Sequence, residues 1–215
     1  MSLEPLLKAT WETVYMVAVS GACAALLGIP LGFLLFIFGP RTIYGRPTIY
    51  QPLALMVNTA RSIPFIILLV ALIPFTRFVI GTSIGTTAAL VPLTLSAVPF
   101  LARLTEGSLL AIPYGLIEAA MAMGATRTQL LYRVLWPESL ASIINGITVT
   151  TVNLVGYSAM AGAIGGGGLG DLAIRYGYQR FDISVMLLTI AVLIVLVQGL
   201  QSMGEMCSRM VKRGQ

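Results

Sequence analysis

Long uncharged runs of hydrophobic residues alternate with short polar segments along this chain. A helix needs about 20 apolar residues to cross a hydrocarbon core of roughly 30 Å. Five runs reach that length, with Arg61 as the one interruption, and they cover residues 14–38, 53–75, 78–102, 139–162 and 183–204. The pattern predicts an all-α, polytopic membrane protein with five transmembrane helices in a single domain, residues 1–215.

Composition strengthens the membrane prediction and weakens any enzymatic one. The chain is 57% hydrophobic and 10% charged, with a mean hydropathy of +0.92, so it has too few polar residues to cover a soluble surface of its size. It contains no histidine, and its acidic residues are scattered singly. We therefore expect membrane lipid around the spans, and we expect no catalytic residues and no metal site in the chain.

The distribution of cations predicts the orientation. Cytoplasmic loops retain Lys and Arg, so the side of the membrane with more of them is the inner side. With the N-terminus outside and the C-terminus inside, the outer segments hold only Lys8, Arg77, Arg175 and Arg180. The inner segments then hold Arg41, Arg46, Arg103, Arg127, Arg133, Arg209, Lys212 and Arg213. The formal charge of +5 follows from this bias, and the dispersed cations form no stripe suited to nucleic acid.

Residues 103–137 interrupt the membrane pattern on the predicted cytoplasmic side. After Pro113 the apolar residues recur with helical spacing, and a turn follows at Gly124. Thr126 and Gln129 then fit a capping box that begins a second helix, expected to end at Pro137. The apolar face of the first helix would comprise Leu116, Ile117, Ala120 and Met121, and that of the second Leu130, Leu131, Val134 and Leu135. Two short amphipathic helices joined at a glycine are suited to docking on a partner protein, and a purely structural loop is the alternative.

Within this segment, Glu118-Ala119-Ala120 is followed after three residues by Gly124 and after nine more by Val134-Leu135-Trp136-Pro137. The spacing resembles the EAA loop of ABC importer permeases, with Trp136 as a departure where the family has leucine. Longer stretches resemble the methionine permease branch of that family. They are residues 61–69, 73–77, 81–85 and 154–162.

The resemblance implies a type I ABC importer fold in the bacterial inner membrane. It implies that Glu118 and Gly124 belong to a coupling loop, residues 103–137, seated on a separate ATPase dimer that binds ATP and magnesium. It also implies a second copy of this chain, an extracytoplasmic substrate-binding protein or lipoprotein, and methionine as the substrate. Another small amino acid is the alternative substrate, because residue chemistry alone does not distinguish them.

The fourth run supplies the candidate lining of a translocation pathway: Met160, with Tyr157 and Ser158 beside it. A flexible, polarisable methionine suits a gate, although ordinary packing explains such a residue equally simply. Arg61 is the other candidate, since an ionisable group in a span must pair, reach the interface or face water. A side chain extending to the cytoplasmic surface is the alternative for Arg61.

Gly165, Gly167 and Gly170 match the G-x-G-x-x-G pattern of dinucleotide sites, but no strand precedes them. We interpret the run as flexible backbone at the outer mouth or as a plain connecting loop. The sequence also lacks the Walker pattern of a nucleotide-binding loop, so hydrolysis of ATP falls to a partner. An ion-coupled secondary transporter is the rival function, and the absence of a carboxylate deep in any predicted span counts against it.

Overall fold

The computed structural model describes residues 3–40 and 45–213, and every regular element in these ranges is a helix. Arg41, one of the cations assigned to the inner side, lies outside the described residues. In chain order the elements are α1 (Leu3–Phe38), α2 (Pro47–Ser62), α3 (Phe65–Ala71), α4 (Ile73–Ile80), α5 (Thr86–Leu110), α6 (Tyr114–Ala122), α7 (Arg127–Gln129), η1 (Leu130–Leu135), α8 (Trp136–Ala163), α9 (Gly168–Leu172), η2 (Ala173–Tyr178) and α10 (Ile183–Arg213). The two η elements are π-helical.

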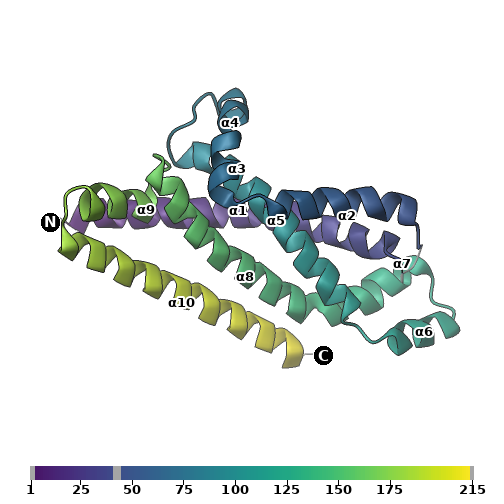
Figure 1. Ribbon diagram of the computed structural model, residues 1–215. Helices are drawn as coiled ribbons and strands as arrows, with labels where there is room; N and C mark the ends of the chain where they lie inside the picture. Colours follow the sequence, from purple (N-terminus) through teal and green to yellow (C-terminus); the bar gives the residue numbers. More distant parts are fainter. Residues whose placement is uncertain (1–2, 41–44, 214–215) are drawn as a thin grey trace.

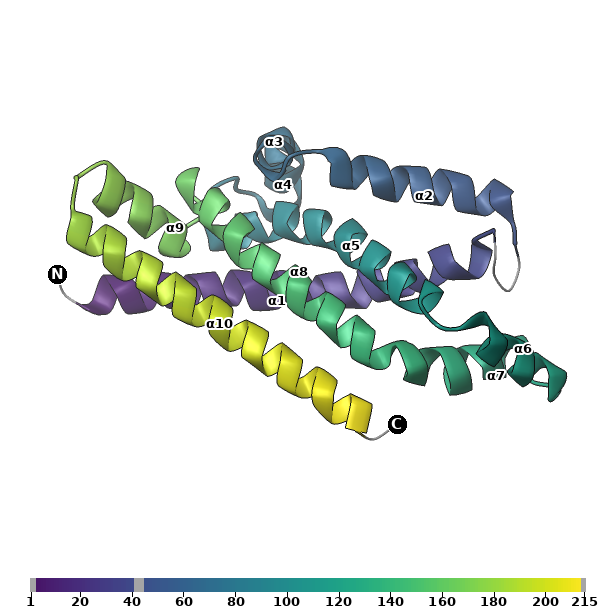
Figure 2. The same ribbon diagram turned by 60° about the horizontal axis from the view of Figure 1, so that its bottom comes forward.

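The long helices form an elongated bundle with different structures at its two ends (Figure 1). The N-terminus, α9 and the start of α10 lie at one end, whereas α6 and α7 lie at the other. The short helices α3 and α4 project from the side of the bundle, and the rotated view shows the same arrangement (Figure 2). The predicted coupling segment and the glycine run are therefore separated by the length of the bundle.

Within the described ranges, four helical stretches are long and apolar enough to cross a membrane: Glu4–Phe38, Thr86–Leu110, Arg127–Ala163 and Ile183–Lys212. A fifth crossing is obtained if α2 and α3, which are bent by 100° relative to each other, are counted as one broken span. The structure therefore has four or five crossings where five were predicted, and the prediction of an all-helical polytopic membrane protein is confirmed.

The helix bounds differ from the predicted ones where proline or glycine intervenes. The predicted span 53–75 is divided because Pro64 holds Ile63 in an extended conformation, which ends α2 at Ser62. The predicted span 78–102 contains the loop after α4, so α5 begins only at Thr86. It then continues to Leu110 and includes Arg103 and Glu106, which hydropathy had assigned to the polar segment.

The core of the bundle is built on close contact between α1 and α5. A side chain at Gly28 would place its Cβ 2.9 Å from the carbonyl oxygen of Val98, and one at Gly32 would meet Thr105 at 2.5 Å. The absence of side chains at these two glycines therefore permits the close approach of α1 and α5. Around this contact lie the largest buried residues of the core, among them Met16, Leu93, Leu101 and Leu154.

Candidate functional site

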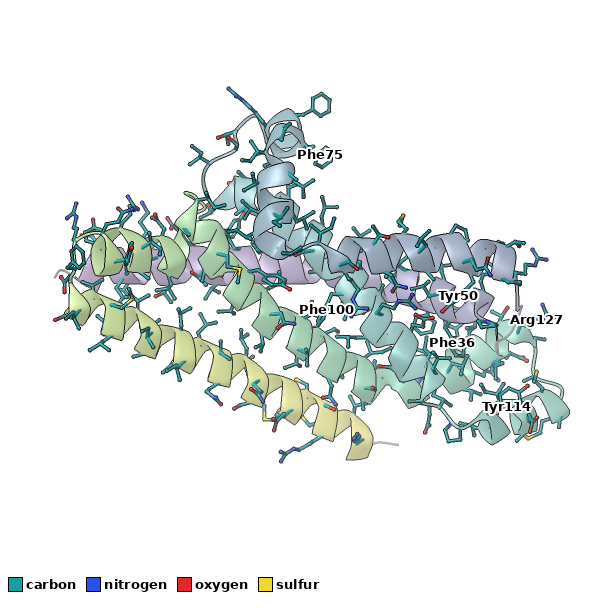
Figure 3. All side chains as sticks on the ribbon, viewed as in Figure 1. Phe36, Tyr50, Phe75, Phe100, Tyr114 and Arg127 are labelled. Atoms are coloured by element: carbon teal, nitrogen blue, oxygen red, sulfur yellow. The ribbon has the colours of Figure 1, made fainter. Side chains whose placement is uncertain are left out.

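The predicted coupling segment forms a distinct layer at one end of the bundle. In Figure 3, Phe36, Tyr50, Tyr114 and Arg127 lie at this end, whereas Phe75 lies on the projecting α4. Ala120 is buried in α6, where it packs with Phe36, Leu109, Leu130 and Leu135. This cluster fixes the segment to the bundle by one of its faces.

The other face of α6 is uncovered. Glu118 and Ala119 are exposed, and so are Leu116 and Met121. Ile117 and Ala120 pack inward at the middle of the predicted apolar face, and Met121 lines the same inner pocket as Ile117, while Leu116 lies at the exposed edge of that face. A short helix that packs on the bundle by one face and exposes Glu118 and Ala119 on the other is suited to lie between the bundle and a partner.

The turn at Gly124 and the capping box are as predicted. Gly124 has a φ of 83°, a left-handed conformation that favours glycine. The backbone N–H of Gln129 donates to Thr126 Oγ1 at 3.3 Å, and the N–H of Thr126 donates to Gln129 Oε1 at 2.8 Å. The turn and the cap together fix where the second helix begins.

The predicted end of this second helix at Pro137 is wrong. Residues Arg127–Ala163 form one continuous helical stretch of 37 residues, which passes through Pro137 directly after the π-helical segment Leu130–Leu135. The π-helical turn before it is closed by the N–H of Trp136, which donates to the carbonyl oxygen of Leu131. The coupling segment is thus joined to a membrane span without a break.

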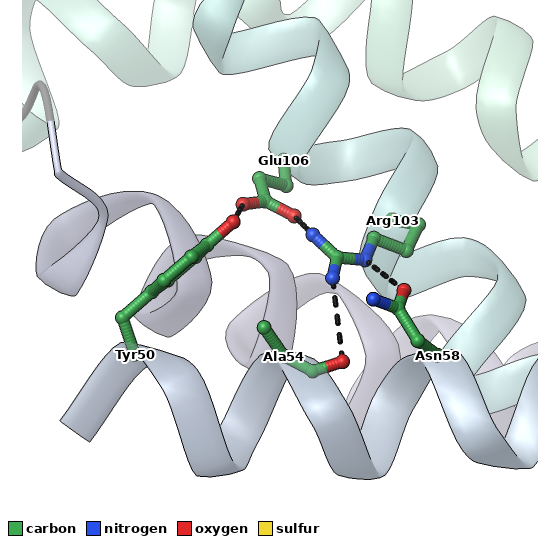
Figure 4. Close-up of polar contacts among 5 residues, drawn as sticks. All are labelled: Tyr50, Ala54, Asn58, Arg103 and Glu106. Atoms are coloured by element: carbon green, nitrogen blue, oxygen red, sulfur yellow. Dashed lines mark hydrogen bonds and ion pairs between the residues drawn. The ribbon is translucent and has the colours of Figure 1, made fainter. Parts of the chain in front are cut away.

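A polar cluster ties α2 to the end of α5 that leads into α6 (Figure 4). Arg103 pairs with the carboxylate of Glu106, and its Nε donates to Asn58 Oδ1 at 3.0 Å and its Nη2 to the carbonyl oxygen of Ala54 at 3.3 Å. The hydroxyl of Tyr50 donates to Glu106 Oε1 at 3.2 Å. Glu106 is only 4% exposed, so these hydrogen bonds replace the water that its carboxylate has lost. We call these five residues the α2–α5 clamp.

The candidate pathway residues are placed in different environments. Met160 is 46% exposed, whereas Ser158 is 1% exposed and its hydroxyl donates to the carbonyl oxygen of Val155 at 2.7 Å. Tyr157 stacks on Phe65 of α3, with ring centroids 4.5 Å apart. Met160 is therefore available to a pathway, Tyr157 joins α8 to α3, and Ser158 is used in packing.

Arg61 lies near the end of α2, just before the break at Pro64. Its side chain is exposed, and its guanidinium carbon lies 5.7 Å from the ring centroid of Phe100 on α5. Among the described residues it forms no salt bridge. The contact with Phe100 holds the guanidinium of Arg61 against α5, while its N–H groups stay available to another partner.

The glycine run is a tightly packed turn, so its interpretation as flexible backbone is wrong. Gly166, Gly168 and Gly170 are buried, and a side chain at Gly170 would overlap the backbone of Ala159. Two side chains of α1 accept hydrogen bonds from the start of α9. The N–H of Gly168 donates to Glu12 Oε2 and that of Leu169 to Thr13 Oγ1, both at 2.8 Å.

These two contacts were missed by sequence analysis, which began the first span at Val14. The helix in fact begins at Leu3, and its polar residues are tolerated because they satisfy backbone donors that α9 leaves unpaired. The signal in the sequence was the adjacent polar pair Glu12 and Thr13 on one turn of the helix. A hydropathy pattern does not show that such a pair has a binding partner.

The charges between Asp171 and Asp182 are largely engaged locally. Arg175 pairs with Asp171, and this hydrogen bond raises the pKa of the guanidinium above its ordinary value. Arg180 lies 4.6 Å from the ring centroid of Tyr176, and Asp182 accepts from the N–H of Val185 at the start of α10. The arginines are exposed and remain able to meet another protein.

Residues 28–205 match the sequence profile of the family described as the binding-protein-dependent transport system inner membrane component. The chain belongs to this family. It is therefore an ABC transporter permease subunit of the bacterial inner membrane, and ATP is hydrolysed by a separate subunit.

Individual proteins are also similar to this chain over most of its length. The chain is 53% identical over 211 residues to the probable D-methionine transport system permease protein MetI of Vibrio cholerae, covering 98% of this chain and 94% of that one. It is 52% identical over 157 residues to the D-methionine transport system permease protein MetI of Escherichia coli K12, covering 73% and 72%. An inward-facing structure of the MetNI methionine ABC transporter superposes with a TM-score of 0.95 at 47% identity, covering 98% and 99%.

Proposed function

We propose that this chain is the permease subunit of an ATP-driven methionine importer. The similarity to permeases named for methionine supports the substrate. The observation that carries the mechanism is the unbroken helical stretch Arg127–Ala163, which joins the coupling segment to Tyr157 and Met160. At about 1.5 Å per residue, Arg127 and Met160 are roughly 50 Å apart along that helix.

In the proposed complex, two copies of the chain enclose the pathway and two ATPase subunits bind beneath them. The ATPases hold ATP and magnesium, and their closure displaces the exposed face of α6, with Glu118 as its polar contact. The turn at Gly124 sets the angle between α6 and α7, so it determines the direction in which α7 moves when α6 is displaced. The continuous helix through Pro137 transmits this movement to α8. Movement of α8 then changes the position of Met160 while an extracytoplasmic binding protein delivers the substrate to the outer end.

Uptake in proteoliposomes tests this function. The chain is reconstituted with its ATPase. ATP is supplied on the side of the ATPase, and the binding protein and radiolabelled L- or D-methionine are supplied on the opposite side. We expect ATP-dependent accumulation that persists when ionophores collapse the ion gradients. Accumulation driven by an ion gradient without ATP would contradict the proposal, and uptake of a different amino acid in preference to methionine would contradict its substrate.

A further inference from the structure

One uncovered side of the bundle carries polar side chains inside two membrane-spanning helices. Asn145 is exposed and Asn153 half-buried on α8, and Gln201 and Glu205 are exposed on α10. Gln201 and Glu205 lie just beyond the long apolar run of α10, which ends at Leu200. Amide and carboxylate side chains at the end of a membrane-spanning run are expected to face water, protein or a ligand and not lipid.

These four residues line a single groove between α8 and α10. The groove has a volume of about 370 Å³, and the apolar side chains of Val149 and Val152 contribute to its wall. α8 and α10 are held together beside it, since a side chain at Gly204 would overlap Thr148. The hydroxyl of Ser208 also donates to the carbonyl oxygen of Ala141 at 3.1 Å. The groove is thus a fixed feature of the helix pair.

The hydrogen-bonding capacity of this groove is largely unused. Within the described part of the chain, the side-chain amides of Asn145, Asn153 and Gln201 form no hydrogen bond. Glu205 pairs with Arg209 through Oε2 at 3.1 Å, which leaves Oε1 available. Amide N–H donors, one carboxylate oxygen and an apolar wall occur together in one groove.

We propose that this groove is a binding subsite for the substrate in the inner half of the pathway, where it recognises the zwitterionic end of an apolar amino acid. Glu205 Oε1 accepts from the α-ammonium group, and the amides of Asn145 and Gln201 donate to the α-carboxylate. The side chain of the amino acid lies against Val149 and Val152. An open groove binds weakly, which suits a site that must release its ligand. The inference rests on the proposed function and adds the residues that contact the substrate.

Protection of an introduced thiol by substrate tests the subsite. Asn145→Cys is made in a parent in which Cys23 and Cys207 are replaced by serine, and the complex with its ATPase is kept in membrane vesicles. The rate of labelling by a charged, water-soluble thiol reagent is measured with and without L-methionine. We expect saturating methionine to slow labelling roughly fivefold or more, as occupancy of the site approaches completion.

Two further measurements separate direct contact from an indirect effect. Glu205→Gln in the same background should raise the methionine concentration for half-protection about tenfold, because a charge-assisted hydrogen bond is lost. A methionine analogue without the amino group should protect the thiol in the Glu205-containing protein as poorly as methionine protects it in the Glu205→Gln variant. Ser202→Cys, an exposed position on α10 outside the groove, is the control and should be labelled at the same rate with or without methionine.

Several outcomes would overturn the subsite. They are protection that Glu205→Gln leaves unchanged, equal protection at Ser202→Cys, and labelling of Asn145→Cys only by a lipid-soluble reagent, which would place lipid in the groove. A spontaneous disulfide between two copies at this position would place the second copy there instead. Methionine uptake by the cysteine-free parent is measured in the same vesicles, so uptake without protection refutes the subsite alone, whereas absence of uptake refutes the proposed function.

Discussion

Gly124 holds the turn between α6 and α7 in a left-handed backbone conformation, and no neighbouring atom lies within 4 Å of a Cβ built there. A substitution therefore acts through the backbone and not through crowding. Gly124→Val should cost roughly 1–2 kcal/mol in this conformation and change the angle of the turn. We expect ATP hydrolysis to continue while methionine uptake falls several-fold, measured side by side in proteoliposomes.

A second glycine provides the control for this substitution. Gly199 lies within the helical α10, also with no atom within 4 Å of a built Cβ, but without a positive φ. Gly199→Val should leave the ratio of uptake to hydrolysis unchanged. Normal coupling in Gly124→Val would show that the turn does not transmit the movement of the ATPase.

Thr13 is the second residue with a specific expected effect, because its hydroxyl accepts from the buried N–H of Leu169. Thr13→Val would leave that donor unpaired at a cost of about 1–3 kcal/mol. Thermal unfolding of the purified complex should show a lower midpoint. Thr10→Val is the matched control, since the hydroxyl of Thr10 bonds only to Leu6 of its own helix, and equal midpoints for the two variants would contradict an anchoring role.

At the scale of elements, the α2–α5 clamp links the helix that leads to α6 with the helix that leads to the break at Pro64. α5 leads within three residues to α6, and α2 leads to the break at Pro64. Arg103→Met would leave the carboxylate of Glu106 buried without its cation, a loss of about 3–5 kcal/mol. Adding Glu106→Gln should recover much of that loss, which a double-mutant cycle on thermal unfolding measures. Additive losses from the two substitutions would show that the pair is not coupled.

The helices themselves follow from local sequence, whereas their ends and contacts do not. Thr126, Gln129 and Gly124 were predicted correctly because capping and turn chemistry depend on neighbouring residues. Pro64 and Pro137 were misjudged because a proline can divide a helical run, as Pro64 does, or lie within a continuous one, as Pro137 does. Glu12 and Thr13 act through Gly168 and Leu169, partners 156 residues away, which no local pattern reveals.

The candidate site divides in the same way. The first helix, the turn and the capping box of the predicted coupling segment could be predicted because their signals are local. The inward orientation of Ser158 beside the exposed Met160 depends on how α8 is rotated in the bundle, which hydropathy does not determine. The α2–α5 clamp was missed because hydropathy placed Arg103 and Glu106 outside the spans.

For the whole molecule, the continuous stretch from α7 through η1 to α8 predicts movement at Met160 when the ATPases close. Met160→Cys, in the cysteine-free parent complexed with its ATPase, should react with a water-soluble thiol reagent at different rates in the nucleotide-free and ATP-trapped complexes. The rate of labelling in each state is the measurement. Equal rates in the two states would indicate that Met160 is a packing residue.

The position of Glu118 tests the central claim most directly, namely that the exposed face of α6 is seated on the ATPase. Glu118→Cys in the cysteine-free parent is treated with a membrane-impermeant maleimide from one side of the membrane or the other, with and without the ATPase. We predict labelling from the cytoplasmic side only, and protection from it when the ATPase is bound. Labelling from the outer side, or labelling that the ATPase does not change, would contradict the claim.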